Sequence, residues 1–393
     1  MHTVKPIRTR KMKSSKEIEP NLRVLTDYQA FHIQRFGGIT RYFFEIISRM
    51  TDVSAKISIA FSMNQYIRNF AKAEHTHINA RVFKIAEGLF RKLNRQSSIA
   101  EIRKGNFDIF HPSYYDPYFV KYLDGKPFVL TIHDMTHEVL PEYFSPNDPI
   151  YANKRLLAEK ATRIIAISEC TKQDIIKIYG IDESKIDVIY HGIAPMKAVE
   201  DNRLQLPDKY ILYVGERRRY KNFSTLVEAF EQISKIRPDI NLVLTGRKLS
   251  KEEKTLFAQK NISNKVFVFS SIDDNTLALL YRKAEMFVYP SLYEGFGIPI
   301  LEAFSNQCPV VLSKASCFPE VAGDAAEYFE ATNVGTLIQS ITKILEDKLY
   351  RNELVAKGNE RLKLFTWENT AKETVKTYKK AIEEFGNKPL LTT

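Results

Sequence analysis

The chain has 393 residues and a mass of 45.5 kDa, which is too long for one ordinary domain and suits two. Hydrophobic residues make up 44% of it and charged residues 27%, so each half can bury a core and wholesale disorder is excluded. No apolar run approaches the ~18 residues of a membrane-spanning helix, and no apolar stretch follows the basic N-terminus as in a secretory signal.

The cysteine content indicates a reducing compartment. Cys170, Cys308 and Cys317 are too few for a disulfide framework in a chain of this size, and their spacing matches no metal site. We therefore expect a cytoplasmic protein.

The net charge of +11 is concentrated at the start of the chain. Residues 1–110 hold 20 Lys and Arg against 9 Asp and Glu, whereas the later sections are close to neutral. This asymmetry favours a basic face that meets an anionic partner, such as phospholipid, nucleic acid or a phosphate-bearing substrate. A basic surface that is merely solvated is the alternative.

Short apolar, β-branched runs recur along the chain and predict buried strands. Several lack polar alternation, which is typical of parallel strands covered on both faces. The stretches between them are long enough for crossover helices, and residues 223–237 place apolar side chains at helical spacing. In chain order, the predicted strands lie at residues 22–28, 56–62, 107–111, 128–133, 163–168, 187–193, 210–215, 241–246, 266–271, 286–290 and 309–313.

This alternation predicts an α/β protein made of two Rossmann-like βαβ domains that face each other across a cleft. We expect a basic flexible arm over residues 1–20, an N-terminal domain over 21–195, a linker over 196–208, where prolines at 195 and 207 interrupt the pattern, and a C-terminal domain over 209–365. Residues 366–393 are expected to form a helix that packs back on the N-terminal domain.

The segment YPSLYEGFGIPILE at 289–302 carries the most chemical information. A predicted strand ends at Pro290, a loop then holds Glu294 and two glycines, and Pro299 suits the first turn of a helix. Glycines let the backbone approach a ligand, and a helix N-terminus offers N–H groups to phosphate oxygens. Glu302 lies about one turn into that helix. Because carboxylates accept hydrogen bonds from sugar hydroxyls, a ligand with a sugar, a diphosphate and a ribose fits this placement; a glycine-rich turn with two surface glutamates is the alternative.

Cations and a histidine follow other predicted strands. Arg217 and Lys221 come just after the strand that ends at Gly215, where they could neutralise a diphosphate. His133 ends the strand at 128–133, which favours contact with a substrate at the carboxyl edge of the sheet. Solvated loop cations and a buried core histidine are the alternatives.

The motif EGFG at 294–297, with a second glutamate at 302, resembles the E-x7-E signature of retaining GT-B glycosyltransferases of family 4. Further blocks of this family occur in the same order and spacing over about residues 22–385. They are GGITRYFFEI at 37–46, TIHDMTHEVLPEYF at 131–144, IIAISECTKQDI at 164–175, YHGI at 190–193, YVGERRRYKN at 213–222 and FPEVAGDAA at 318–326.

The resemblance implies roles for the residues around the donor diphosphate. Gly37 and Gly38 would let the diphosphate approach the N-terminal domain. Arg217 and Lys221 match the basic pair of the family's G-T-R-x-x-x-K-N pattern, although Tyr220 replaces an arginine that is common there. Arg219, a further cation of this loop, could share the role of Arg217.

The resemblance also implies which residues hold the sugar and the ribose. His133 would contact the transferred sugar, and Glu294 would hold one of its hydroxyls. Glu302 would accept hydrogen bonds from the ribose. The loop residues between the two glutamates would bind phosphate and sugar through their backbone; they are Gly295, Phe296 and Gly297.

The family resemblance predicts a retaining hexosyltransferase. The block at 34–44 is most similar to bacterial O-antigen and capsule mannosyltransferases, so GDP-mannose is the first donor expected and a UDP-hexose the second. The acceptor is expected to be a growing, lipid-linked glycan of a surface polysaccharide. The sequence contains no D-x-D triplet and no cluster with metal-ligand spacing, so we expect transfer without a metal ion or other cofactor.

Other functions fit the same architecture less well. A nucleotide-sugar 2-epimerase lacks the Glu-Gly-Phe-Gly…Glu arrangement, and a silent scaffold or a nucleic-acid-binding protein would not need Glu294, Glu302, Arg217, Lys221 and His133 together. We therefore expect no nucleic-acid partner.

Two segments of the N-terminal half are candidates for acceptor and membrane binding. Tyr114 and Tyr115 follow a predicted strand, and aromatic rings can stack on sugars, although they could equally pack in the core. Residues 81–104 mix apolar side chains with nine charged ones, seven of them basic. They resemble an interfacial helix that docks on an anionic leaflet, so peripheral attachment to the inner face of the plasma membrane is one expectation; a core-facing amphipathic helix is the other.

Overall fold

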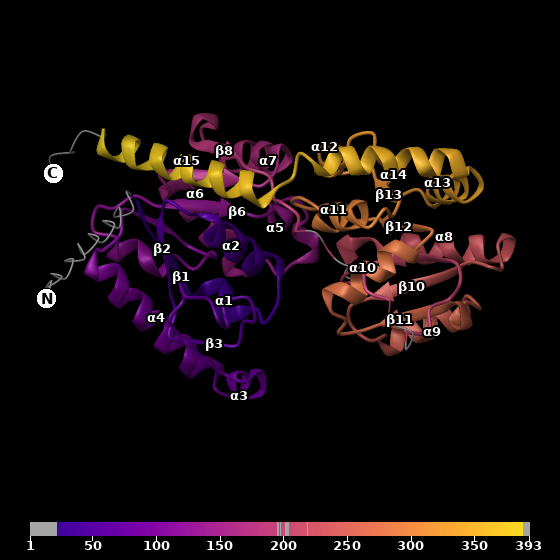
Figure 1. Ribbon diagram of the computed structural model, residues 1–393, viewed down its shortest axis with the longest axis horizontal. Helices are drawn as coiled ribbons and strands as arrows, with labels where there is room; N and C mark the ends of the chain where they lie inside the picture. The colour runs from indigo at the N-terminus through magenta and orange to yellow at the C-terminus, as the bar shows by residue number, and fades with distance from the viewer. Residues whose placement is uncertain (1–21, 195, 197, 201–203, 218, 388–393) are drawn as a thin grey trace, which may run out of the picture.

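A computed structural model describes residues 22–387, apart from 195, 197, 201–203 and 218. The predicted basic arm at 1–20 and part of the predicted linker lie outside the described residues. Figure 1 shows two α/β domains side by side, the N-terminal domain on the left and the C-terminal domain on the right. The predicted fold class, with two parallel-sheet domains, is confirmed.

The N-terminal domain is built on a parallel sheet. Its strands are β1 (Arg23–Asp27), β2 (Ser54–Ser58), β5 (Ile109–His111), β6 (Val129–Ile132), β7 (Arg163–Ala166) and β8 (Ile186–Val188). They pair in the orders β2-β1-β5 and β6-β7-β8, and a parallel bridge between Phe110 and Phe128 joins the two groups. Most of their side chains are buried on both faces, as their unbroken apolar runs require.

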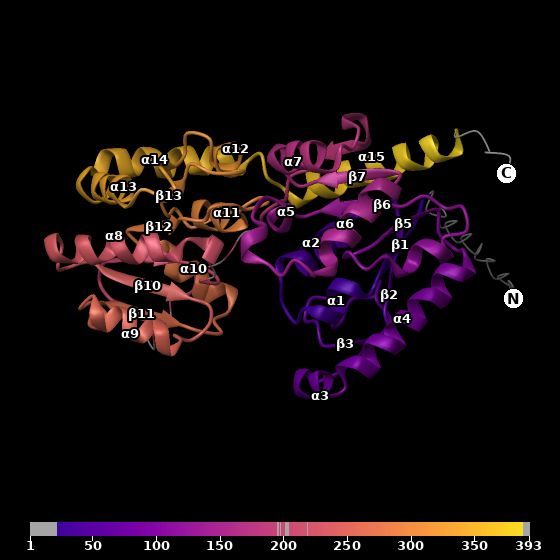
Figure 2. The ribbon, with the colours of Figure 1, turned by 180° about the vertical axis from the view of Figure 1, so that it is seen from behind.

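Helices cover both faces of this sheet (Figures 1 and 2). Side-chain caps fix several of their starts, as where Asp148 accepts from Ile150 N and Ser168 accepts from Thr171 N. The helices are α1 (Gln29–Ile33), α2 (Gly38–Arg49), α3 (Ala80–Ile85), α4 (Glu87–Lys104), α5 (Thr136–Val139), α6 (Pro149–Lys160) and α7 (Glu169–Tyr179), and β3 (Phe61–Ser62) pairs with β4 (Thr76–His77) beside them.

The C-terminal domain repeats this plan with one continuous parallel sheet. Its strands are β9 (Tyr210–Tyr213), β10 (Asn241–Thr245), β11 (Val266–Phe269), β12 (Met286–Tyr289), β13 (Val310–Ser313) and β14 (Glu327–Phe329). They pair in the order β11-β10-β9-β12-β13-β14, so the order of strands reverses between β9 and β12. This arrangement is the doubly wound Rossmann order.

The helices of the C-terminal domain lie on both faces of its sheet (Figure 1). They are α8 (Phe223–Ile236), α9 (Lys251–Gln259), α10 (Asp274–Lys283), α11 (Ile298–Ser305), α12 (Phe318–Ala322), α13 (Val334–Glu346) and α14 (Lys348–Leu362). Asp347 separates the last two of these helices, because it ends α13 and caps α14 by accepting from Tyr350 N.

The last helix, α15 (Trp367–Gly386), lies along the N-terminal domain (Figures 1 and 2). The hydroxyl of Tyr378 lies 2.7 Å from Nδ1 of His111 at the end of β5, and Arg163 of β7 pairs with Glu384 at 2.5 Å. The chain thus crosses back to the first domain, as the sequence predicted.

Several boundaries differ from those predicted. The helix expected over residues 81–104 is two helices, α3 and α4, which meet at Ala86. The strand expected at 187–193 ends at Val188, and β14 was not predicted. Among the described helices, none combines the length and the apolar composition that a bilayer crossing requires.

Candidate active site

The loops after β9 and β12 lie beside the point where the strand order of the C-terminal sheet reverses. In open parallel sheets, ligands bind outside the carboxyl ends of the strands at such a point. The first loop carries Lys221 and the second carries Glu294. Lys221 Nζ lies 2.6 Å from Glu294 Oε1, so the fold brings the predicted diphosphate cation and the predicted sugar-binding carboxylate together.

The environment of Lys221 keeps it charged. Burial by itself would favour the neutral amine, but the Glu294 carboxylate, with Tyr220 and Asp134 farther away, raises the pKa of Lys221 above its usual value. A cation held in this way can oppose the negative charge of a diphosphate without a proton being moved.

Asn222 positions Lys221, and the sequence analysis did not single it out. Its backbone has a φ of 54°, and its Nδ2 donates to Pro290 O at 3.0 Å and to Ala331 O at 2.6 Å. These bonds tie the loop after β9 to the end of β12. The sequence signal for this role was an asparagine directly after Lys221 in a loop that follows a predicted strand. Asparagine suits such a position because it tolerates the left-handed backbone conformation.

The glycine-rich loop of the C-terminal domain packs directly on the N-terminal domain. A Cβ added at Gly295 would lie 1.9 Å from the carbonyl oxygen of His133, so a larger residue would push the domains apart. Ser168 Oγ donates to Gly295 O at 2.7 Å from the start of α7. The predicted residues His133 and Gly295, 162 positions apart in the chain, therefore meet at the contact between the domains.

His133 is a buried neutral imidazole. Burial lowers its pKa to about 4, with Asp134 and Lys154 acting in opposite directions. Its ring lies edge-to-face on Tyr42 with centroids 5.2 Å apart, and its Nε2 has no hydrogen-bond partner within the described part of the chain. An imidazole that stays neutral near pH 7 can accept or donate a hydrogen bond but contributes no positive charge.

The other predicted glycines begin helices that point at the cleft. Gly37 precedes α2, and a Cβ there would lie 2.1 Å from Gln34 Oε1, whereas Gly38 has open space. Gly297 precedes α11 with a φ of 89°, a left-handed conformation that favours glycine. Phe296 is buried against the rings of His191 and other aromatic residues, so its side chain has a packing role.

Glu302 of α11 faces a cation from the other domain. Its Oε2 accepts from Tyr281 OH at 3.2 Å, and its Oε1 lies 3.9 Å from a terminal nitrogen of Arg41 on α2. Burial raises the pKa of Glu302, and Arg41 and Tyr281 counteract it. The predicted ribose acceptor is thus present at the cleft, with Arg41 as a neighbour that the sequence analysis did not identify.

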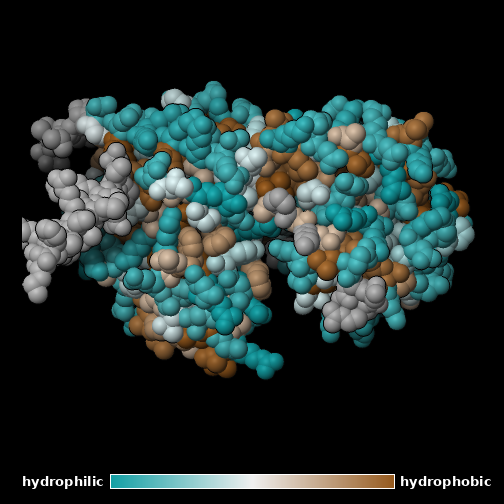
Figure 3. Space-filling model, viewed as in Figure 1, coloured by the Kyte–Doolittle hydropathy of each residue, from teal (hydrophilic) through white to brown (hydrophobic). Residues whose placement is uncertain are grey.

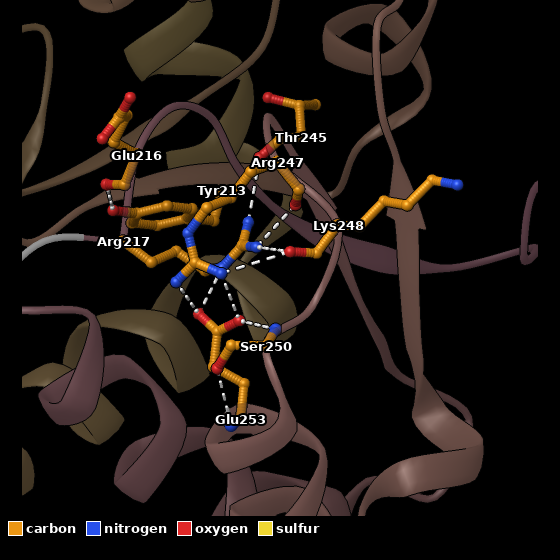
Figure 4. A network of polar contacts seen from close by, with 8 residues as sticks. All are labelled: Tyr213, Glu216, Arg217, Thr245, Arg247, Lys248, Ser250 and Glu253. Carbon is orange, nitrogen blue, oxygen red and sulfur yellow. Dashed lines mark hydrogen bonds and ion pairs between the residues drawn. The ribbon is translucent and has the colours of Figure 1, made fainter.

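Arg217 has partners other than those expected of a diphosphate ligand. Its side chain is 0% exposed, and its Nε donates to Glu253 Oε1 at 2.7 Å. Its terminal nitrogens donate to the backbone oxygens of Thr245, Arg247 and Lys248 at 3.3, 2.6 and 3.3 Å (Figure 4). The guanidinium therefore holds the turn after β10 to the start of α9, and its predicted contact with phosphate stays a prediction.

A cavity of about 720 Å³ opens between the domains beside Glu302, where Figure 3 shows a hollow between the two halves. Its N-terminal wall includes Phe36 and Tyr66, and its C-terminal wall includes Asp274 at the start of α10. Asp274 acts on the pKa of both Tyr66 and Glu302, so these groups lie close together.

A second cavity, of about 440 Å³, lies within the N-terminal domain where its strand order reverses between β1 and β5. Both predicted acceptor residues, Tyr114 and Tyr115, line it together with His32 and Asn153. Tyr115 OH accepts from His133 N at 3.0 Å, which places this cavity next to the cleft. Within the described residues, no group of three or more His, Cys, Asp or Glu side chains could hold a metal ion.

Two family models match the chain. Residues 36–197 match the model described as Glycosyltransferase Family 4, and residues 197–361 match the model described as Glycosyl transferases group 1. The chain belongs to the family 4 glycosyltransferases. The expectation of a transferase enzyme is thereby confirmed, and the cleft residues belong to a glycosyltransferase.

Curated relatives of this glycosyltransferase are identical to it at a little over a quarter of the aligned positions. It is 28% identical over 305 residues to the O-antigen chain mannosyltransferase B of Escherichia coli, over 74% of this chain and 79% of the relative. It is 27% identical over 333 residues to an uncharacterised glycosyltransferase of Methanocaldococcus jannaschii, over 79% of this chain and 84% of the relative.

Solved structures show the same fold. The sucrose-phosphate synthase of Thermosynechococcus elongatus has a TM-score of 0.74 at 20% identity, over 92% of this chain and 99% of that one. Anabaena HepE, solved with UDP and glucose, has a TM-score of 0.73 at 18% identity, over 92% of this chain and 100% of that one. The GT-B architecture expected from the sequence is confirmed.

Proposed function

We propose that this glycosyltransferase moves a hexose, first of all mannose from GDP-mannose, to a lipid-linked glycan with retention of anomeric configuration and without a metal ion. A UDP-hexose is the alternative donor. The observation that carries the proposal is the Lys221–Glu294 ion pair, 2.6 Å long, on loops that pack against His133 through Gly295. The pair joins a cation and a carboxylate, and Gly295 on the same loop as Glu294 meets the carbonyl oxygen of His133.

The proposed step breaks the bond between the anomeric carbon and the diphosphate oxygen, and the electron pair goes to that oxygen. The acceptor hydroxyl oxygen bonds to the same face of the carbon, and its proton passes to the departing phosphate oxygen. Lys221 and the N-terminus of α11 stabilise the growing negative charge. Glu294 orients the sugar by accepting from a hydroxyl. These groups already provide positive charge, which is why we propose that no metal ion is needed.

The preference for a guanine nucleotide is supported by the cavity between the domains. Guanine offers a ring N–H and an amino group as donors, which a carboxylate can accept together, whereas uracil offers a single ring N–H. Asp274 lines this cavity close to Glu302, the proposed ribose acceptor. Two curated relatives are named O-antigen chain mannosyltransferases, which supports mannose as the transferred sugar.

The acceptor sugar is proposed to occupy the cavity at β1 and β5. Asn94 Oδ1 accepts from Ala60 N and Phe61 N at 3.0 and 2.8 Å, so its Nδ2 must be the atom that donates to His32 Nδ1 at 3.2 Å. The proton of His32 is therefore on Nε2, a buried donor without a partner within the described residues. Burial lowers the pKa of His32 to about 4, so it stays a neutral donor that a sugar hydroxyl can satisfy.

The junction of α3 and α4 is proposed to dock on an anionic membrane. Val82, Ile85 and Leu89 are exposed there, Ile85 to 87%, and Figure 3 shows hydrophobic residues at this lower tip. Arg81 and Lys84, also exposed, supply positive charge beside them. The acceptor cavity is close by, because Glu87 and other residues of α4 line it.

A transfer assay tests the proposed function. The protein is incubated in EDTA with GDP-mannose, or in turn with each UDP-hexose, and with a bacterial extract of lipid-linked glycans. We expect GDP release and an α-mannosyl product by NMR. Release that depends on added Mg²⁺ or Mn²⁺ would refute metal independence, a β-linked product would refute retention, and activity with a UDP-hexose alone would replace the donor.

A membrane assay tests the docking surface. Ile85→Glu is expected to abolish flotation with phosphatidylglycerol vesicles, since it places a negative charge at the apolar tip. The control is Leu349→Glu on α14 of the other domain, where the side chain is 83% exposed. Equal flotation of the two variants would refute docking through the α3–α4 junction.

A further inference from the structure

The two negative charges of a nucleotide-sugar diphosphate are only partly balanced by Lys221 and the N-terminus of α11, and Arg217 is bound elsewhere. Its buried guanidinium makes an ion pair and three hydrogen bonds to carbonyl groups within the C-terminal domain. Leaving this site would break all of these bonds and remove the donors of three backbone carbonyl groups, although Glu253 would keep its second partner, Arg247. Lys221 therefore needs a different partner cation.

Arg41 has the position and the freedom that this role requires. It lies in the first turn of α2, three residues after Gly38, and its side chain is 14% exposed. Its two ion pairs are long, 3.7 Å to Glu45 and 3.9 Å to Glu302, and both exceed hydrogen-bond distance. The guanidinium can thus be reoriented by rotating its side chain, without breaking a short bond of its own to a carboxylate.

The contact between Arg41 and Glu302 indicates which ligand group would bind Arg41. Glu302 is the carboxylate proposed to accept from the ribose, and any nucleoside diphosphate carries its phosphates on that same ribose. A ribose hydroxyl bonded to Glu302 would displace Arg41 from the carboxylate while bringing phosphate oxygens near. A guanidinium binds such oxygens with two parallel N–H groups, which is a stronger arrangement than its present 3.9 Å contact.

We propose that Arg41 is the second cation of the donor site and that it exchanges Glu302 for the donor phosphates when the nucleotide binds. This inference rests on the proposed function, because it requires a nucleotide-sugar donor whose ribose is held by Glu302. It makes the N-terminal domain contribute a charged group to donor binding, so the donor itself draws the two domains together.

The test compares a nucleoside diphosphate with its nucleoside. Arg41→Gln is expected to raise the Kd of GDP, or of UDP if the wild type prefers it, by about tenfold or more, because a charge-assisted hydrogen bond to phosphate is lost. The Kd of guanosine or uridine should not rise. Arg41→Lys should lie between. The matched control is Arg49→Gln, two turns along the same helix, where Arg49 also pairs with Glu45 and with Glu368.

Two results would overturn the inference while leaving the proposed function intact. One is an Arg41→Gln variant that binds the diphosphate as the Arg49→Gln control does. The other is tighter binding of the diphosphate by Arg41→Gln, which would mean that Arg41 only competes for Glu302. A wild-type protein that binds no nucleoside diphosphate would overturn both the inference and the proposed function. Circular dichroism of each variant, together with the Arg41→Lys measurement, separates these outcomes from misfolding.

Discussion

Lys221 and Glu294 form an ion pair 2.6 Å long although 73 residues separate them in the chain. They meet because β9 and β12 are neighbours in the sheet, at the point where the strand order reverses. The pair is also prearranged, since Asn222 ties the loop of Lys221 to Pro290 at the end of β12. A donor sugar and its diphosphate would find both groups already in place.

Lys221→Ala is expected to lower kcat at least about 100-fold, because the departing diphosphate loses a cation in a partly buried site. The measurement is initial rate of nucleotide release at saturating donor. Lys343→Ala serves as control, since Lys343 pairs with Glu327 at 2.9 Å on the far edge of the same domain. Turnover by Lys221→Ala close to that of the control would refute the phosphate assignment.

Glu302→Ala is expected to act mainly on donor binding. The variant removes the acceptor proposed for the ribose hydroxyls, so the Kd of the nucleotide should rise by about tenfold or more, with a smaller change in kcat. Isothermal titration with the nucleoside diphosphate measures the effect. An unchanged Kd would exclude the ribose role of Glu302.

Arg217→Gln is expected to destabilise the fold rather than only slow the enzyme. It removes one of the two guanidinium partners of Glu253 and the bonds to the turn after β10, so buried carbonyl groups lose their donors, a loss of about 1–3 kcal/mol. Urea denaturation compares it with Arg155→Gln, whose exposed pair with Glu159 should contribute less than ~1 kcal/mol. Equal stabilities of the two variants would show that Arg217 is not a structural residue.

The contrast between Lys221 and Arg217 shows what the sequence could predict. Both were predicted to meet a diphosphate, since both are cations just after a strand. Alternating apolar runs were enough for the fold class, and motif spacing was enough for Lys221, Glu294 and His133 to be placed at one cleft. Arg217 instead pairs with Glu253, which lies 36 residues later in the chain. The carboxylate of Glu253 also accepts from Ser250 N at the start of α9, and this bond holds it near the guanidinium.

Sequence reasoning missed residues whose contacts depend on tertiary packing. Arg41 reaches Glu302 only because the domains meet at Gly295 and His133, and no local pattern encodes that contact. Asn94 is similar, because its bonds to His32 and to the backbone at residues 60 and 61 depend on tertiary packing.

Stability should fall as the pH drops below about 6.5. Burial lowers the pKa of His133 and His32 to about 4 and that of His111 to about 3. As the pH falls below 6.5, the unfolded chain therefore binds more protons than the folded protein does. Their contribution is fully present above pH 6.5 and is lost progressively toward pH 4, whereas Asp27 and Glu302, whose pKa values burial raises, act in the opposite direction.

Urea denaturation at pH 7, 6 and 5 measures this effect. The difference between the wild type and His111→Gln isolates one histidine, since the carboxylates are common to both. The wild type should lose more unfolding free energy than the variant over this range. Parallel pH profiles would show that His111 is not held neutral in the folded protein.

His32→Phe is expected to raise the KM of the acceptor by about tenfold while leaving the donor KM unchanged, because it removes the Nε2 donor of the acceptor cavity. His75→Phe is the matched control: His75 Nε2 also lacks a partner within the described residues, and His75 is not among the residues that line that cavity. If both variants show the same acceptor KM, the sugar is bound elsewhere.

Thermal unfolding with GDP, UDP, ADP, TDP and CDP, each with and without EDTA, tests the central claim most directly. A ligand that binds only the folded protein raises its melting temperature. The account predicts a shift with GDP that EDTA does not reduce and that Lys221→Ala diminishes. No shift with any of the five nucleotides would contradict a donor site at the Lys221–Glu294 pair, and a shift that EDTA abolishes would contradict metal-independent binding.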